Sequence, residues 1–214
     1  MKFRDRLTIV AAVTAALLSP GGRIVAAPTV LVMGDSISAA YGIQREQGWV
    51  ALFSERLTRQ VPGAAVINAS VSGETTGGGL ARLPGMLATH DPDVVVIELG
   101  GNDALRGYPV RTIRDNLSRM IKLAYTGERD VVVVGMQIPP NYGPRYTEAF
   151  TRVFEQVADE HDALLVPFLL ENVALEPGLM QRDGIHPTAD AQPLLLETFW
   201  QRVAPLISGT VSGD

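Results

Sequence analysis

Short apolar runs alternate with longer stretches of helical periodicity through most of this 214-residue chain. The runs are rich in β-branched residues and almost continuously apolar, which is typical of parallel strands covered on both faces. We therefore predict a five-stranded parallel sheet. Its strands are expected at residues 29–33, 65–68, 94–98, 131–135 and 164–166.

The segments between these runs carry apolar stripes at helical spacing. One stripe consists of Trp49, Leu52, Phe53 and Leu57. We expect helices around residues 49–57, 76–88, 113–123, 153–158 and 194–203. Strands that alternate with helices in this way predict an α/β fold, a three-layer α/β/α sandwich that forms one domain from residue 27 to residue 214. Ligands of such open sheets bind beyond the carboxyl ends of the strands.

The two ends of the chain do not belong to this pattern. Residues 1–26 combine a basic start, an apolar run over 7–18 and small residues before Pro28, which is the layout of a secretory signal peptide. The run is too short to span a bilayer of about 30 Å, so we expect cleavage after Ala26, a periplasmic or secreted protein and no stable membrane insertion. A retained N-terminal anchor is the alternative. The polar tail 207–214 is expected to be frayed.

Charge and cysteine content narrow the possible functions. The whole chain carries a net charge of −5, and removal of the basic N-terminal segment makes it more acidic. Such a balance gives no electrostatic footprint for nucleic acid or anionic lipid. The chain contains no cysteine, which excludes disulfides, a thiol nucleophile and thiolate metal sites.

Ser36 directly follows the first predicted strand, in the sequence G-D-S. One interpretation is that Asp35 or Ser36 caps a following helix. The other is that a tight strand-to-helix turn exposes the Ser36 hydroxyl as a nucleophile, which then needs a base.

Three histidines are available as that base. His90 and His161 each precede a predicted strand, at the edge of the sheet opposite Ser36, and a structural role is expected for both. His186 lies in a loop after the last strand, three residues after Asp183. This spacing lets the carboxylate orient the imidazole toward a serine. A solvated turn is the alternative interpretation of Asp183 and His186. A zinc site is disfavoured because no second histidine is expected in reach of His186, and a magnesium site stays open. We expect no cofactor.

Acyl transfer also requires donors for an oxyanion. The candidates are the backbone N–H groups of Ser36 and Gly73 and the side-chain amide of Asn102, all at predicted strand ends. An ordinary turn glycine and turn asparagine are the alternatives.

Together, G-D-S at 34–36, Gly73, G-N-D at 101–103 and D-x-x-H at 183–186 resemble the four blocks of the SGNH, or GDSL, hydrolase family. Longer stretches such as I-E-L-G-G-N-D-A-L-R-G are similar to a branch of bacterial periplasmic acyl-CoA thioesterases that also act as lysophospholipases and arylesterases. The resemblance covers essentially the whole chain after residue 26. One departure is Ile37, where the family name implies leucine.

The resemblance implies a flavodoxin-like sandwich and a serine hydrolase of fatty acyl esters and thioesters. It assigns Ser36, His186 and Asp183 as the catalytic triad and Ser36, Gly73 and Asn102 as the oxyanion hole. A short-chain or carbohydrate acetylesterase and a non-catalytic periplasmic anion-binding protein are the alternative functions. We expect a monomer that acts on small-molecule substrates. The expected walls of an acyl site are Leu105, Ile138, Pro139 and Tyr142.

Overall fold

The computed structural model describes residues 27–126 and 129–212, and its centre is a five-stranded parallel sheet. The strand order is β2-β1-β3-β4-β5, so the order reverses next to β1, as in flavodoxin-like folds. The prediction of fold class is confirmed. The strands are β1 (Thr29–Gly34), β2 (Ala65–Asn68), β3 (Val94–Glu98), β4 (Asp130–Val134) and β5 (Leu164–Val166).

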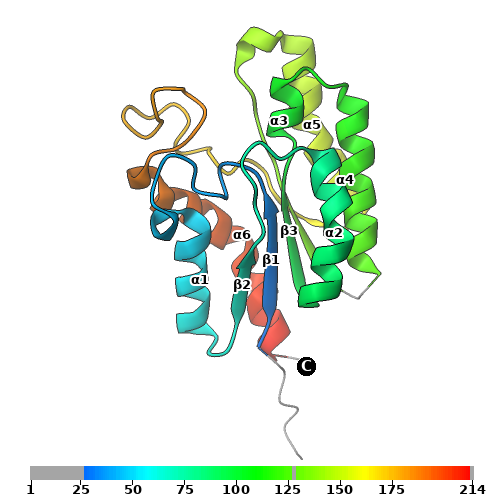
Figure 1. Cartoon of the computed structure of the whole chain (residues 1–214), viewed down its shortest axis with the longest axis vertical. Coiled ribbons are helices and arrows are strands. Elements are labelled where there is room, and N and C mark those ends of the chain that lie inside the picture. The colour runs from blue at the N-terminus through cyan, green and yellow to red at the C-terminus, as the bar shows by residue number, and fades with distance from the viewer. Residues whose placement is uncertain (1–26, 127–128, 213–214) are drawn as a thin grey trace, which may run out of the picture.

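Helices cover both faces of this sheet (Figure 1). Helices α1 and α6 pack on one face, and α2, α4 and α5 pack on the other. The helices are α1 (Trp49–Gln60), α2 (Thr76–His90), α3 (Gly101–Leu105), α4 (Val110–Tyr125), α5 (Pro144–Glu160) and α6 (Gln192–Ser212). Three single turns of 3₁₀ helix add to them, at Arg45–Gln47, Pro140–Tyr142 and Ala189–Ala191.

The strands are buried on both faces, which explains their continuous apolar sequences. Alternate residues of β1 enter opposite cores: Val30 and Val32 pack with α1 and α6, and Leu31 and Met33 pack with α2, α4 and α5. All five residues of β3 are buried, because this strand is central. The sheet is therefore a rigid platform for the loops at its carboxyl edge.

Three predictions about local structure need correction or comment. No helix follows Ser36 directly: the chain turns from residue 36 to residue 42, and α1 begins only at Trp49. The Gly101–Leu105 segment, which is not among the helices expected from the sequence, forms the short helix α3. Helix α6 continues to Ser212, and the expected fraying of the segment 207–214 stays a prediction.

The signal peptide expected at residues 1–26 lies outside the described residues. Within 27–126 and 129–212, none of the helices combines the length and apolar character needed to cross a membrane.

Candidate active site

The candidate site lies where the connections after β1, β2, β3 and β5 meet. Because the strands are parallel, their carboxyl ends share one edge of the sheet, and Ser36, Gly73, Asn102 and His186 each come from a connection at that edge.

Ser36, His186 and Asp183 form a continuous hydrogen-bonded line. The Ser36 hydroxyl lies 2.8 Å from His186 Nε2, and His186 Nδ1 lies 2.7 Å from Asp183 Oδ2. The bond to the imidazole, with backbone N–H groups of Ile185 and His186, lowers the pKa of Asp183 to about 2. The carboxylate therefore stays charged at any ordinary pH and can stabilise a positive imidazole.

The loop that carries His186 is folded back on itself. An isolated antiparallel bridge joins Met180 to Pro187, and the Gln181 N–H donates to the His186 carbonyl at 2.7 Å. Asp183 Oδ1 accepts from the N–H groups of Ile185 and His186, at 3.0 and 3.1 Å. The turn thus holds one carboxylate oxygen on the backbone and leaves the other for the imidazole.

The Ser36 turn is held by backbone bonds and by Asp35. The Tyr41 N–H donates to the Ser36 carbonyl at 3.0 Å, and the Ile37 N–H donates to Asp35 Oδ1 at 3.0 Å. Asp35 Oδ2 accepts from the Asn102 amide at 3.1 Å. Burial is the main cause that raises the pKa of Asp35 to about 6. Asp35 therefore supports the turn and also contacts a predicted oxyanion donor.

Glu98 is a second buried acid below this turn, and the sequence reasoning missed it. Its Oε2 accepts from the Ser38 hydroxyl at 2.7 Å and from the Asp35 N–H at 3.2 Å. Burial and then the charge of Asp35 raise the pKa of Glu98 well above its ordinary value. An acid that ends a central run of four aliphatic residues, V-V-V-I-E, was the signal available in the sequence.

Gly73 and Asn102 occupy separate loops beside Ser36. Gly73 has a φ of 80° in a turn closed by a bond from the Glu74 N–H to the Val71 carbonyl, a conformation that favours glycine. Among the bonds of residues 27–126 and 129–212, none takes the N–H of Ser36 or of Gly73. Both donors are therefore available to a ligand.

Two arginines that the sequence reasoning missed hold the Gly73 loop. Arg106 donates to the Gly73 carbonyl at 3.1 Å. Arg82 donates to Glu74 Oε2 at 2.6 Å and to the Ala69 carbonyl at 2.8 Å. Charged donors of this kind make strong hydrogen bonds, which fix the loop against α2 and α3.

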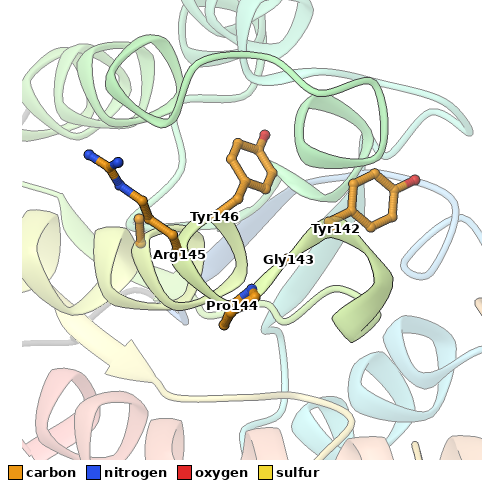
Figure 2. Close-up of a pocket in the computed structure, with 6 residues that line it drawn as sticks. Tyr142, Gly143, Pro144, Arg145 and Tyr146 are labelled. Carbon is orange, nitrogen blue, oxygen red and sulfur yellow. The ribbon is translucent and has the colours of Figure 1, made fainter.

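The four residues expected to form an acyl site are brought together only in part. The Tyr142 hydroxyl donates to the Leu105 carbonyl at 3.1 Å, so these two residues meet. Ile138 packs on the core against α4 and α5, and Pro139 is exposed. An open hollow of about 400 Å³ at the start of α5 is lined by Tyr142, Gly143, Pro144, Arg145, Tyr146 and Ala149 (Figure 2). Neither Ser36 nor His186 lines this hollow.

The other histidines lie away from this edge. His161 follows α5, and its Nε2 lies 2.6 Å from the Ser118 hydroxyl of α4. His90 ends α2, before β3. In the described part of the chain, no group of three or more acidic or histidine side chains is arranged to hold a metal ion.

A parallel sheet of this order is a flavodoxin-like α/β fold, and its polar groups gather at the carboxyl edge, where such folds bind ligands. The sequence profile of the GDSL-like Lipase/Acylhydrolase family matches residues 32–193, and the chain belongs to this family.

Sequence alignments with known relatives extend over most of the chain. It is 53% identical over 182 residues to the esterase TesA of Pseudomonas aeruginosa, an alignment that covers 85% of this chain and 90% of the relative. It is 39% identical over 186 residues to the thioesterase 1/protease 1/lysophospholipase L1 of Escherichia coli, covering 87% of this chain and 88% of the relative. A crystal structure of TesA superposes with a TM-score of 0.81 at 53% identity and covers 83% of this chain and 99% of that structure. The chain is therefore an ester-bond hydrolase.

Proposed function

We propose that this enzyme cleaves fatty acyl esters and thioesters through a covalent acyl–Ser36 intermediate. The observation that carries the proposal is the hydrogen-bonded line from the Ser36 hydroxyl through His186 to Asp183. A serine hydroxyl is a weak nucleophile until an adjacent base takes its proton. His186 Nε2, at 2.8 Å, is within the distance needed for that transfer.

In the first half of the reaction, Ser36 Oγ attacks the substrate carbonyl carbon while its proton passes to His186 Nε2. The charged Asp183 stabilises the imidazolium that forms. The tetrahedral intermediate then collapses, the bond to the leaving oxygen or sulfur breaks, and His186 gives its proton to that atom. The product is an acyl–Ser36 ester and a free alcohol or thiol.

In the second half, water replaces the alcohol or thiol. His186 takes a proton from the water as its oxygen attacks the acyl carbon, and returns the proton to Ser36 Oγ as that oxygen leaves. The carboxylic acid is released and the enzyme is regenerated, so the cycle requires no oxidant, reductant or cofactor.

Three donors are proposed to stabilise the negative oxygen of each tetrahedral intermediate. They are the free N–H groups of Ser36 and Gly73 and the side-chain amide of Asn102. Such donors act most strongly when they are fixed before the reaction. The arginine bonds to the Gly73 loop and the Asp35 bond to Asn102 support this function because they limit the movement of two of the three donors.

The proposed substrates are medium-to-long acyl esters, thioesters and lysophospholipids, in line with the names of the esterase and thioesterase/lysophospholipase relatives. Leu105 and Tyr142, joined by a hydrogen bond, are proposed to form one wall for the acyl chain, with Ile138 and Pro139 beyond them. We also propose that residues 1–26 direct export and that the exported enzyme, residues 27–214, is monomeric. Fractionation of cells, with mass measurement of the enzyme recovered, tests the processing and the state of association.

The decisive experiment measures turnover of p-nitrophenyl esters and acyl-CoAs of graded chain length by wild type, Ser36→Ala and a control, Ser54→Ala in α1. Wild type and the control should turn over esters, and Ser36→Ala should lose about 10⁴-fold or more in kcat. Ser36→Ala at the wild-type rate would refute the nucleophile. Activity confined to acetyl esters would favour the acetylesterase alternative.

A further inference from the structure

The ring of Tyr41 lies against the imidazole of His186. The two ring centroids are 4.5 Å apart, with the ring planes tilted by 39°. About half of Tyr41 is exposed, at 52%. A single exposed aromatic side chain is ordinary on a protein surface. This one is unusual because it touches the proposed base and still presents free ring surface to solvent.

The backbone of Tyr41 is fixed from two directions. Its N–H donates to the Ser36 carbonyl at 3.0 Å, and its carbonyl accepts from Gln181 Nε2 at 2.8 Å. The same Gln181 Nε2 donates to the Pro187 carbonyl at 3.0 Å, next to His186. Tyr41 therefore links the Ser36 turn to the His186 loop, although these segments lie about 150 residues apart.

The residues on either side of Tyr41 adopt conformations that only a constrained turn maintains. Ala40 has a φ of 59°, which is costly for a residue with a Cβ atom. Gly42 has a φ of 78°, and a Cβ atom there would lie 2.3 Å from Gln181 Oε1. A turn held this firmly keeps the Tyr41 ring beside His186.

The position of Tyr41 relates it to one part of the substrate. His186 must deliver its proton to the leaving oxygen or sulfur, so that atom comes within about 3 Å of Nε2. The group attached to it then extends from the imidazole toward solvent, and the exposed ring of Tyr41 is in contact with His186 there. Two of the three proposed oxyanion donors, Gly73 and Asn102, are on the connections after β2 and β3, away from the turn that carries Tyr41.

We propose that Tyr41 determines leaving-group specificity, by forming a wall that favours flat, aromatic leaving groups over alkyl ones. The inference rests on the proposed function, because it assumes that His186 protonates the leaving group. An aromatic ring beside an aromatic leaving group gains an offset or edge-to-face contact that an alkyl group does not make.

Two esters with the same acyl group isolate this effect. Phenyl butyrate and ethyl butyrate pass through the same butyryl–Ser36 intermediate, so their deacylation steps are identical and kcat/KM reports acylation alone. We would measure both esters with wild type, Tyr41→Phe and Tyr41→Leu. Tyr125→Leu, the same substitution at the end of α4, is the matched control.

Tyr41→Leu should lower kcat/KM for phenyl butyrate by about 3- to 10-fold more than for ethyl butyrate. Tyr41→Phe and Tyr125→Leu should leave the ratio of kcat/KM for phenyl butyrate to kcat/KM for ethyl butyrate within about 2-fold of the wild-type ratio. The deacylation rate, measured as the steady rate after a p-nitrophenyl butyrate burst, should not change in Tyr41→Leu.

Three outcomes would overturn the inference. An equal loss on both esters, with slower deacylation, would mean that Tyr41 only positions His186. An unchanged ratio in Tyr41→Leu would mean that the ring does not contact the leaving group. A loss in Tyr41→Phe equal to that in Tyr41→Leu would assign the effect to the hydroxyl. Failure of the proposed function is distinct, because it would appear as persistent turnover in Ser36→Ala.

Discussion

The carboxylate of Asp35 accepts a 3.1 Å hydrogen bond from the side-chain amide of Asn102. An amide NH₂ group has two N–H donors, so one can be held by Asp35 while the other is free for an oxyanion. Asp35 precedes the proposed nucleophile in sequence, and its Oδ1 is anchored by the Ile37 N–H. One carboxylate thus connects the Ser36 turn to the proposed third donor.

Removal of that donor should reduce catalysis without unfolding the protein. Asn102→Ala should lower kcat by about 100-fold or more with little change in KM, because the interaction exists mainly in the transition state. Asn116→Ala in α4 is the matched control, since its amide donates to the Thr76 hydroxyl and Asn116 is half-buried like Asn102. Initial rates on p-nitrophenyl butyrate check both variants, and equal rates would contradict the assignment.

Substitution of Asp35 should act through Asn102. In Asp35→Asn, the new side-chain oxygen can still accept the hydrogen bond from the Ile37 N–H. The new side-chain NH₂ group then faces the NH₂ group of Asn102. Two donors cannot bond to each other, so we expect kcat to fall by about 10-fold, less than on removal of the donor. Added to Asn102→Ala, the Asp35→Asn change should cost little more. Full additivity in the double variant would refute the coupling.

Asp183→Asn should reverse the tautomer of His186. Asp183 Oδ1 is fixed by the N–H groups of Ile185 and His186, so the carbonyl oxygen of an asparagine is expected there. Its NH₂ group would then face Nδ1 and place the imidazole proton on Nε2, which could no longer accept from Ser36. We expect kcat to fall by about 10³-fold or more. Asn substitution at the exposed Asp190 is the control, and steady-state rates that match between the two variants would exclude this role.

Sequence patterns predicted most of the fold because the strands are buried on both faces. Runs such as V-V-V-I at 94–97 have no polar face and fit only the centre of a covered sheet. The turn after Ser36 was predicted less well. Both interpretations of G-D-S had a helix begin near Ser36, but Ala40 and Gly42 adopt positive φ values, which helical geometry excludes and which composition does not reveal.

The sequence predicted that Ser36, His186 and Asp183 meet, but it did not predict the residues that hold their loops. The unusual combination of Ser36, Asp183 and His186 was visible as residue types at strand ends. The supporting residues could not be recognised in the sequence, because each bonds to a segment that precedes it along the chain. Glu98 holds the Ser36 turn, and Arg82 and Arg106 hold the Gly73 loop. Their partners are set by the strand order, and only the folded chain brings them together.

The buried acids should make stability fall as pH rises above 4. Asp35 has a pKa of about 6 when folded, against about 3.9 in an unfolded chain, so between these values the folded state holds a proton that the unfolded state has lost. The free energy of unfolding therefore decreases through this window, and Glu98 acts in the same direction. Asp183 has the opposite sign, but its contribution is lost only as pH falls from about 4 toward about 2.

Urea unfolding at pH 4.5 and 6.5 tests this, with Asp35→Asn as the comparison. Asparagine does not titrate, so the variant should gain about 1 kcal/mol or more relative to wild type between the two pH values. A difference between the proteins that does not vary with pH would contradict the raised pKa.

The end of β4 should not tolerate any side chain at Gly135. A Cβ atom there would lie 2.0 Å from the Pro167 carbonyl oxygen, a backbone atom that cannot rotate away. The Gly135 N–H also donates to the Val166 carbonyl at 2.7 Å, so relief of the clash would separate β4 from β5. Gly135→Ala should therefore cost about 3 kcal/mol of unfolding free energy.

The matched control for this substitution is Gly85→Ala. Gly85 lies in α2, is exposed, and would meet nothing within 4 Å of an added Cβ atom. Because alanine favours a helix over glycine, this variant should gain about 0.5–1 kcal/mol. Pro167 begins the connection that leads to His186, so Gly135→Ala should also lower kcat at temperatures where the protein stays folded. Urea unfolding midpoints check the stability effect, and initial rates at about 15 and about 25 °C check the effect on kcat. Equal stability of the two alanine variants would refute the clash.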